Sequence, residues 1–140
     1  IVVDQRHVEV RLGNLIIANS QQNYRILETA SPPTFYIPPQ NVRIQLLELL
    51  PESSVCEWKG SARYWALRNP HGSQQSIAWC YPTPNPPFEA IAGHLSFYPS
   101  LVECFVNGER VRPQPGEFYG GWVTSEIAGP FKGEPGTERW

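Results

Sequence analysis

Aspartate and lysine are scarce in this chain of 140 residues, and their scarcity argues against two common kinds of phosphate chemistry. Asp4 is the only aspartate, and the only lysines are Lys59 and Lys132. Because two-metal phosphoryl transfer uses clustered carboxylates, commonly aspartate, the sequence lacks the usual ligand set of that reaction. The glycine-rich segment 129–137 contains Lys132, but not the G-x-x-x-x-G-K-[ST] order that places backbone amides and a lysine around a phosphate.

An excess of positive charge and a long apolar run are also missing. Lysine and arginine total 11 against 13 acidic residues, which gives a formal net charge of −2. Duplex-binding proteins usually carry a basic excess or a basic stripe, because neutralising phosphates supplies much of their affinity. The sequence therefore argues against nucleic acid as a partner. The longest apolar stretches, such as Leu15–Ala18, are far shorter than the roughly 20 residues of a transmembrane helix, so we expect no membrane span.

Cysteine is present but lacks the spacing of a disulfide or zinc protein. The three cysteines are Cys56, Cys80 and Cys104, and no C-x-x-C pair occurs. An odd number without close pairs argues against a disulfide framework and against a structural zinc site, which uses four closely paired ligands. We expect reduced thiols, no metal and no cofactor, in a cytoplasmic protein without a signal peptide.

Proline, glycine and aromatic residues, by contrast, are plentiful and indicate the fold class. The chain has 15 prolines, 11 glycines and 12% aromatic residues. A disordered chain lacks such aromatics, and a protein of long helices does not tolerate so many prolines. We expect a single domain over 1–140, mainly β, with compact antiparallel sheets and one or two short helices. The glycine- and proline-rich residues 113–140 are expected to form an irregular C-terminal extension packed on this core.

Two hairpins are the clearest local features of the sequence. The segment His7–Leu12 alternates polar and apolar residues, which is typical of a half-buried strand, and a Gly-Asn turn leads to a partner strand at Leu15–Ala18. Within Leu101–Arg112, Asn107 and Gly108 lie between apolar runs and predict a type I′ turn. Further strands are expected at Tyr24–Thr29, Thr34–Ile37, Ala62–Leu67 and Ile77–Tyr81.

Three other segments predict helical turns or a loop. Asn41–Leu50 fits both helical and strand spacing, and we expect a helical turn that runs into a strand. Pro87–Ala92 has proline at its start and Gly93 just past its end, which predicts a short helix. The turn residues of Asn69–Ser73 predict a hairpin loop between two strands rich in Trp and Tyr.

Lys59 is the first candidate for a functional role, because it is one of two lysines in an arginine-rich chain and lies between Trp58 and Gly60. Glycine permits close approach of the backbone, and an aromatic ring beside an ammonium can line a pocket wall, which favours recognition of an anion or a carbonyl. The alternative is a turn lysine whose stem covers the neighbouring ring. Lys132 has similar neighbours and the same two interpretations.

The tryptophans and tyrosines of two neighbouring predicted strands suggest a cleft. Trp65 and Trp79 alternate with Tyr64 and Tyr81 along these strands. We expect one sheet face to present an aromatic cleft walled by Tyr36, Trp65, Trp79 and Tyr81, which is the usual lining of a small-molecule site. Two alternatives are that these rings form only core, or that they stack the bases of a single strand of nucleic acid.

Glu28 follows an apolar strand and precedes a Pro-Pro stretch, so it is a candidate ligand-orienting carboxylate beside the aromatic wall. We expect the Lys59 ammonium to lie within a few ångströms of an aromatic ring and a carboxylate, with Glu28 as the preferred partner. Such a pair favours the charged lysine, which binds an anion or polarises a carbonyl rather than acting as a base. The alternatives are that Glu28 pairs with an arginine and that Lys59 lies at least ~10 Å from any pocket, about one Debye length at 0.1 M salt.

A series of short motifs gives the chain a family resemblance. They are Leu27-Glu28-Thr29, Pro32-Pro33-Thr34-Phe35-Tyr36-Ile37-Pro38, Trp58-Lys59-Gly60, Tyr64-Trp65, Ala78-Trp79, Ile91-Ala92-Gly93 and Phe97-Tyr98-Pro99. In their order and spacing, residues 8–112 resemble the DUF427 family, a bacterial and fungal domain of unknown function that also carries a nucleotidyltransferase-like label. The residues around Trp122 and the segment 129–137 resemble an extension found in part of that family.

The resemblance implies a β-tent-like fold, in which small antiparallel sheets meet at an angle around a cleft. Several proteins with that fold bind zinc through C-x-x-C pairs, and the resemblance carries no metal over to this chain because the pairs are missing. The residues therefore predict a small-molecule binding domain with an aromatic-walled cleft, with catalysis left open. In that cleft Lys59 and Glu28 supply the polar contacts.

The alternative function is a non-catalytic module that binds single-stranded nucleic acid or a protein partner. Arg63 and Arg68 stand beside Tyr64 and Trp65, which combines cations for phosphates with rings for stacking. Salt-dependent binding to an unstructured oligonucleotide distinguishes this function from a small-molecule pocket.

Overall fold

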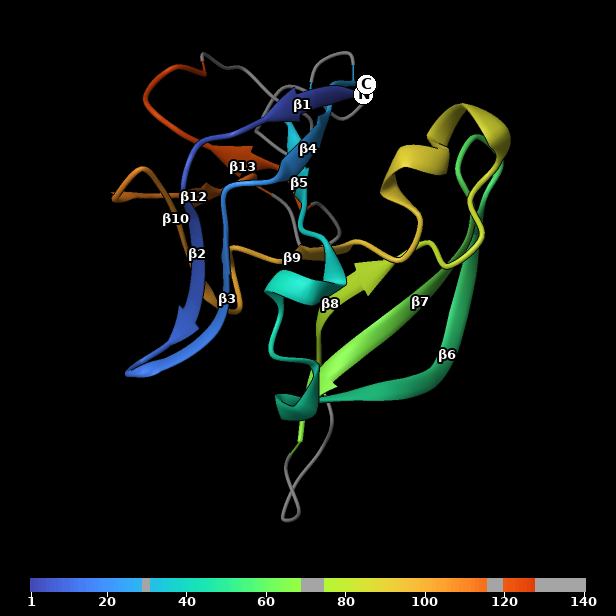
Figure 1. Ribbon diagram of the computed structural model, residues 1–140, viewed down its shortest axis with the longest axis horizontal. Helices are drawn as coiled ribbons and strands as arrows, with labels where there is room; N and C mark the ends of the chain where they lie inside the picture. Colours follow the sequence, from blue (N-terminus) through green and yellow to red (C-terminus); the bar gives the residue numbers. More distant parts are fainter. Residues whose placement is uncertain (29–30, 69–74, 116–119, 128–140) are drawn as a thin grey trace.

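The computed structural model describes residues 1–28, 31–68, 75–115 and 120–127. Over these residues the chain is mainly β, with antiparallel strands and three short 3₁₀-helices, which confirms the fold class expected from the composition (Figure 1). The strands are β1 (Val2–Asp4), β2 (Val8–Leu12), β3 (Leu15–Ser20), β4 (Asn23–Ile26), β5 (Thr34–Tyr36), β6 (Leu47–Cys56), β7 (Gly60–Leu67), β8 (Ser76–Cys80), β9 (Leu95–Phe97), β10 (Glu103–Val106), β11 (Glu109–Arg110), β12 (Arg112–Pro113) and β13 (Trp122–Val123). The 3₁₀-helices are η1 (Pro39–Asn41), η2 (Ile44–Leu46) and η3 (Pro86–Ile91).

The strands form two four-stranded sheets and two smaller ones. One large sheet has the order β11-β10-β2-β3 and the other has the order β6-β7-β8-β9, while β1-β4-β5 and β12-β13 form the smaller sheets. Figure 1 shows β2, β3 and β10 on one side of the molecule and β6, β7 and β8 on the other. The three-stranded sheet β1-β4-β5 is joined to the sheet β6-β7-β8-β9 where Ile37, just after β5, exchanges backbone hydrogen bonds of 2.8 and 2.9 Å with Leu95 of β9.

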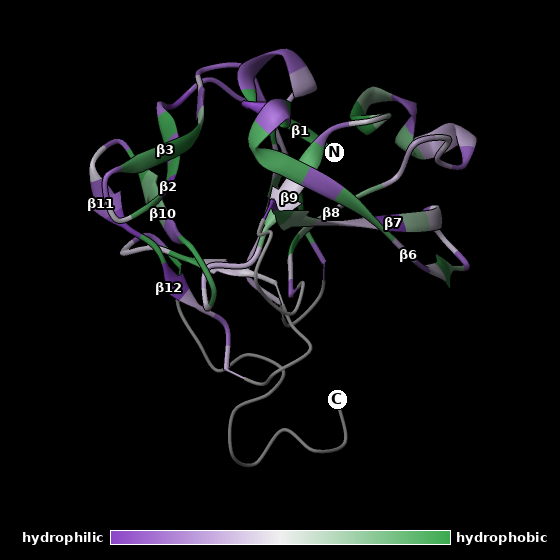
Figure 2. Ribbon diagram, turned by 90° about the horizontal axis from the view of Figure 1, so that it is seen from below, coloured by the Kyte–Doolittle hydropathy of each residue, from purple (hydrophilic) through white to green (hydrophobic). Residues whose placement is uncertain are grey.

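The two hairpins predicted from the sequence are present. In β2 the side chains of Val8 and Val10 are fully buried. Figure 2 shows both hydrophobic and hydrophilic residues along β2, β3 and β10. The turn between β10 and β11 has positive φ at both central residues, 48° at Asn107 and 82° at Gly108. Two successive positive φ angles define the type I′ turn, so this prediction is confirmed.

The prediction of a helical turn that runs into a strand is confirmed by η2 and β6, but the strand continues to Cys56 rather than ending at Leu50. Pro51 lies where the register between β6 and β7 shifts, between Leu49 and Ser53. Because β6 is an edge strand, a proline there leaves no central ladder bond unmade. The predicted helix at residues 87–92 is the 3₁₀-helix η3, and the predicted loop at 69–73 lies outside the described residues.

The buried side chains form one large hydrophobic cluster and one smaller aromatic cluster. The large cluster includes Trp122, which is fully buried and stacks on Phe35 with ring centroids 4.8 Å apart. The Trp122 Nε1 donates a hydrogen bond of 3.0 Å to the carbonyl oxygen of Phe97. Residues 120–127 of the glycine-rich extension therefore pack on the core, while residues 116–119 and 128–140, including Lys132, lie outside the described residues.

Asp4 on β1 is the centre of a buried ion cluster. The side chain is 4% exposed, and its Oδ2 accepts a hydrogen bond of 2.7 Å from Nη2 of Arg6 and lies 3.0 Å from Nε of Arg25. Burial acts to raise the pKa of Asp4, but the hydrogen bonds and charge of Arg6 and the charge of Arg25 outweigh it, so the pKa is lowered. Because Arg6 also pairs with Glu126, the cluster ties the start of the chain to the segment after β13.

Candidate functional site

A cavity of about 220 Å³ lies against the smaller aromatic cluster. It gathers five of the six residues that the sequence nominates for a ligand site, namely Glu28, Tyr36, Lys59, Trp79 and Tyr81. The remaining lining residues are Thr34, Tyr64, Tyr98 and Gly120. We call this cavity, with these nine lining residues, the aromatic cleft.

Lys59 and Glu28 meet at the aromatic cleft as an ion pair. Lys59 lies in the turn between β6 and β7, and its Nζ donates to Oε1 of Glu28, which follows β4. The Lys59 side chain is only 13% exposed, whereas that of Glu28 is 51% exposed. The pairing expected from the sequence is therefore confirmed, and the alternative of a lysine far from any pocket is wrong.

The turn that carries Lys59 is fixed by Asn85. The backbone N–H of Asn85 donates to the Lys59 carbonyl at 2.8 Å, and its Nδ2 donates to the carbonyls of Trp58 and Glu57 at 3.0 and 3.2 Å. Gly60 follows with a φ of 112°, which L side chains rarely adopt. Trp58 is 77% exposed and is not among the lining residues of the cleft, so the ring next to Lys59 in the sequence does not form a pocket wall, contrary to expectation.

The floor of the aromatic cleft is a hydrogen-bonded pair of rings. Trp79 Nε1 donates to the hydroxyl of Tyr36 at 3.2 Å, and the two rings meet edge to face with centroids 6.2 Å apart. The ring of Tyr98 lies against the other part of Trp79, with a centroid distance of 4.7 Å. Burial raises the pKa of Tyr36 to about 12 and that of Tyr98 to about 12, and it also raises the pKa of Tyr81. These phenols are therefore neutral at physiological pH.

Gly120 completes the wall because only glycine fits against the indole of Trp79. A Cβ at this position would lie 2.3 Å from Cη2 and 2.7 Å from Cζ3 of Trp79. The conflict is steric alone, since the backbone of Gly120 is not in the left-handed region. Gly120, two residues before β13, thus limits the position of the Trp79 ring in the cleft.

Replacing Gly120 with alanine is expected to lower the free energy of unfolding by about 1–3 kcal/mol, the range typical of overpacking. The added methyl group forces the Trp79 indole away from the Tyr36 hydroxyl. Urea denaturation of Gly120→Ala measures this loss. In a Trp79→Phe background the conflicting ring atoms are absent, so alanine at 120 should then have much less effect. An equal loss in both backgrounds contradicts the contact.

Comparison with known families places most of this chain in one of them. A family model described as a domain of unknown function (DUF427), which also carries a nucleotidyltransferase-like name, matches residues 1–108. The chain belongs to this family. No curated protein matches the sequence. In this DUF427 protein the match covers β1 to β10, whereas Gly120 and Trp122 come after it.

The DUF427 chain places Trp65 apart from the aromatic cleft. In the register of β7 and β8, Tyr64 is opposite Trp79 and Trp65 is opposite Ala78. Because successive strand residues face opposite sides, Tyr64 points to the cleft while Trp65 packs on the large cluster. Trp65 Nε1 lies 3.4 Å from Sγ of Cys80, to which it donates.

Four lining residues of the DUF427 cleft were missed by the sequence analysis. Tyr64 and Tyr98 each carry a signal, because Tyr64 neighbours Trp65 and Tyr98 belongs to a Phe-Tyr pair. Gly120 carries no comparable signal, since only tertiary packing brings it to Trp79, whereas Thr34 lies two residues from Tyr36 on β5 and so shares its strand face.

The two arginines named for the alternative function, Arg63 and Arg68, donate hydrogen bonds to backbone carbonyls. Arg63 Nη2 donates to the Leu50 carbonyl at 3.1 Å, and Arg68 Nε donates to the Gln45 carbonyl at 3.1 Å. Their aromatic neighbours on β7 face opposite sides of the sheet, so they do not form one stacking surface. Nucleic-acid binding stays a prediction without added support.

Within the described segments, no group of three or more His, Cys, Asp or Glu side chains is arranged to hold a metal ion. Every helix in these segments also falls short of the length and apolar character of a membrane span.

Proposed function

We propose that the aromatic cleft binds a small planar molecule through a carbonyl or carboxylate oxygen. The observation that carries the proposal is the Lys59 ammonium, largely buried at a cavity whose other lining residues are, apart from its partner Glu28, uncharged and mostly aromatic. An ammonium has three N–H donors, and Glu28 accepts from one of them. Among the described residues Nζ has no second acceptor, which leaves donors for an oxygen of the bound molecule.

The size and walls of the cleft favour a ligand with one ring or two. A cavity of about 220 Å³ is smaller than the roughly 300–1,000 Å³ of sites for drug-sized molecules. The rings of Trp79 and Tyr98 offer apolar faces against which a planar group can pack. The neutral phenols can donate hydrogen bonds without repelling an anion. The Lys59 ammonium and the surrounding rings suit the binding and polarisation of a carbonyl or carboxylate oxygen.

Titration of ¹⁵N-labelled protein with benzoate and benzamide tests the proposal. We expect saturable shifts of the Trp79 indole Nε1–H signal while that of Trp65, on the opposite sheet face, stays in place. Cyclohexanecarboxylate, which keeps the carboxylate but is not planar, should bind more weakly, and so should aniline, which lacks an oxygen acceptor. Shifts confined to Trp65, or no saturable shift at all, contradict the proposal.

Replacing Lys59 with methionine is expected to weaken benzoate binding about tenfold or more, since a hydrogen bond to a charged group contributes roughly 1.5–3 kcal/mol. Stability should change by about 1 kcal/mol or less, because Glu28 is half exposed and such ion pairs contribute little. Arg68→Met removes a cation outside the cleft and is the matched control. A Lys59→Met variant that binds benzoate like the unmodified protein overturns the role of Lys59.

A further inference from the structure

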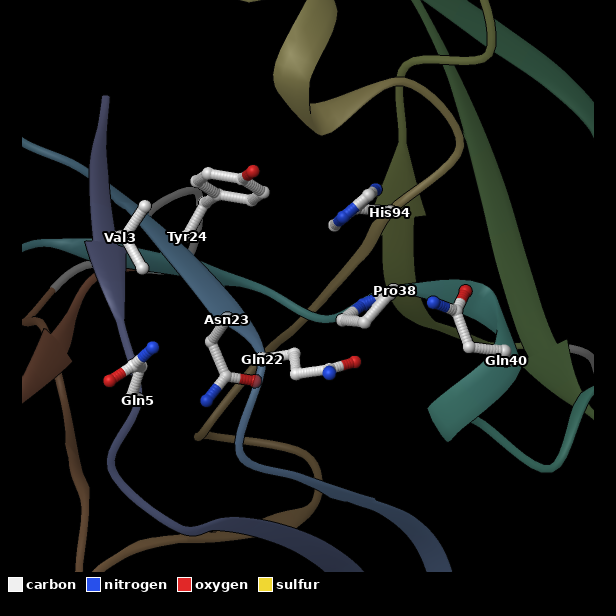
Figure 3. A pocket seen from close by; sticks show the side chains of 8 residues that line it. All are labelled: Val3, Gln5, Gln22, Asn23, Tyr24, Pro38, Gln40 and His94. Atoms are coloured by element: carbon white, nitrogen blue, oxygen red, sulfur yellow. The ribbon is translucent and has the colours of Figure 1, made fainter.

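A second cavity, of about 280 Å³, lies between strands β1 and β4 on one side and His94 on the other (Figure 3). It shares no lining residue with the aromatic cleft. Its lining residues are Val3, Gln5, Gln22, Asn23, Tyr24, Pro38, Gln40 and His94.

The polar groups of this second cavity are uncharged. Four carboxamides line it, those of Gln5, Gln22, Asn23 and Gln40, and no Asp, Glu, Lys or Arg is among its lining residues. A charged ligand would meet no opposite charge there. A carboxamide carries both a carbonyl acceptor and N–H donors, which matches neighbouring hydroxyl groups that each donate and accept.

Asn23 is the most constrained of these carboxamides. It is 1% exposed, and its Nδ2 donates to the backbone carbonyls of Arg6 at 3.0 Å and Ser20 at 3.5 Å. Two carbonyl acceptors fix the orientation of the amide, since its oxygen could not face them. The Oδ1 atom is buried and has no hydrogen-bond partner among the described residues. Figure 3 shows this oxygen turned toward the exposed side chain of Gln22.

Tyr24 and His94 supply an aromatic corner with one further acceptor. Their ring centroids are 5.6 Å apart and their planes are tilted by 56°. Nδ1 of His94 lies 3.1 Å from the Ala92 carbonyl, which can only accept, so Nδ1 carries the proton of the neutral ring. Nε2 is then an acceptor, and Figure 3 shows the imidazole facing Tyr24 across the cavity.

We infer that this cavity binds a neutral, hydroxyl-rich ligand of monosaccharide size. The carboxamides and the His94 Nε2 pair with its hydroxyl groups, and a ligand hydroxyl donates to the unpaired Oδ1 of Asn23. The C–H face of a sugar ring packs against Tyr24. The site is independent of the function proposed for the aromatic cleft.

The experiment is a titration of the ¹⁵N-labelled protein with D-glucose, D-galactose and D-ribose. At least one sugar should give saturable shifts of the Asn23 side-chain amide and of the Gln22 and Gln40 amides, while the Trp79 indole signal stays in place. The failure of all three sugars to shift these signals overturns the inference. So does a result in which only the anionic sugar glucuronate shifts them, because the cavity offers no cation.

Substitutions of lining residues test whether the sugar binds in this cavity. His94→Phe keeps a ring beside Tyr24 but removes the Nε2 acceptor, and binding of the sugar should weaken about fivefold or more. His7→Phe, which changes a histidine outside the cavity, is the matched control and should bind the sugar like the unmodified protein.

Gln40→Ala, an exposed substitution that leaves the fold unchanged, should weaken sugar binding as well. Lys59→Met should not. Equal affinity of His94→Phe, Gln40→Ala and the unmodified protein overturns the inference.

Discussion

Replacing Trp122 with alanine is expected to lower the free energy of unfolding by about 4 kcal/mol, in the middle of the range for truncating a buried aromatic residue. Trp122 is fully buried, stacks on Phe35, and donates to the Phe97 carbonyl. Alanine leaves a cavity beside β5 and an unpaired carbonyl beside β9. Urea denaturation followed by circular dichroism measures the change.

Trp58→Ala is the matched control for this variant. Trp58 is 77% exposed, so its removal should change stability by about 0.5 kcal/mol or less. Trp122 lies beyond residues 1–108, which the family model matches. A loss at Trp122→Ala no larger than that at Trp58→Ala would show that residues 120–127 are not part of the core.

Replacing Asp4 with asparagine is expected to lower the free energy of unfolding at neutral pH by about 2 kcal/mol, because hydrogen bonds to a charged group are lost beside two arginines. The folded protein lowers the pKa of Asp4, so its stabilisation is fully present above the ordinary carboxyl pKa of about 3.9. It is lost as the pH falls through the lower pKa of the folded state. Asp4→Asn should therefore show a flatter decline of stability with acid.

Denaturation curves between neutral pH and strongly acidic solution check this dependence on Asp4. Glu9→Gln is the control, since Glu9 lies 3.7 Å from Arg11 in a partly exposed pair that contributes little. The account of the buried cluster is wrong if Asp4→Asn and Glu9→Gln lose stability equally, or if the acid dependence of Asp4→Asn matches that of the unmodified protein.

Local sequence patterns predicted much of this fold, because its turns and strands depend on residues that are close together in the chain. The type I′ turn at Asn107 and Gly108 depends on two residues that tolerate positive φ, and the strand at β2 depends on a period of two. The extent of β6 was missed, because proline in an edge strand is permitted only by the sheet order. The sheet order comes from contacts between distant segments.

The candidate site was partly predictable for the same reason. Lys59 stood out by its rarity, and Glu28 was nominated as its partner because it follows an apolar strand and precedes a Pro-Pro stretch beside the predicted wall. Whether Trp65 or Tyr64 faces the cleft depends on which of them is opposite Trp79. This register is a property of the pairing of β7 with β8 and cannot be read from β7 alone. The contact of Gly120 with Trp79 depends on a segment 41 residues away in the sequence.

The most direct test of the aromatic cleft is a crystal structure of the protein soaked with benzoate. The account predicts the benzoate ring against Trp79 and Tyr98, with a carboxylate oxygen within hydrogen-bond distance of Lys59 Nζ. Benzoate bound elsewhere, or a cleft without benzoate while Lys59 is still paired only with Glu28, would contradict it.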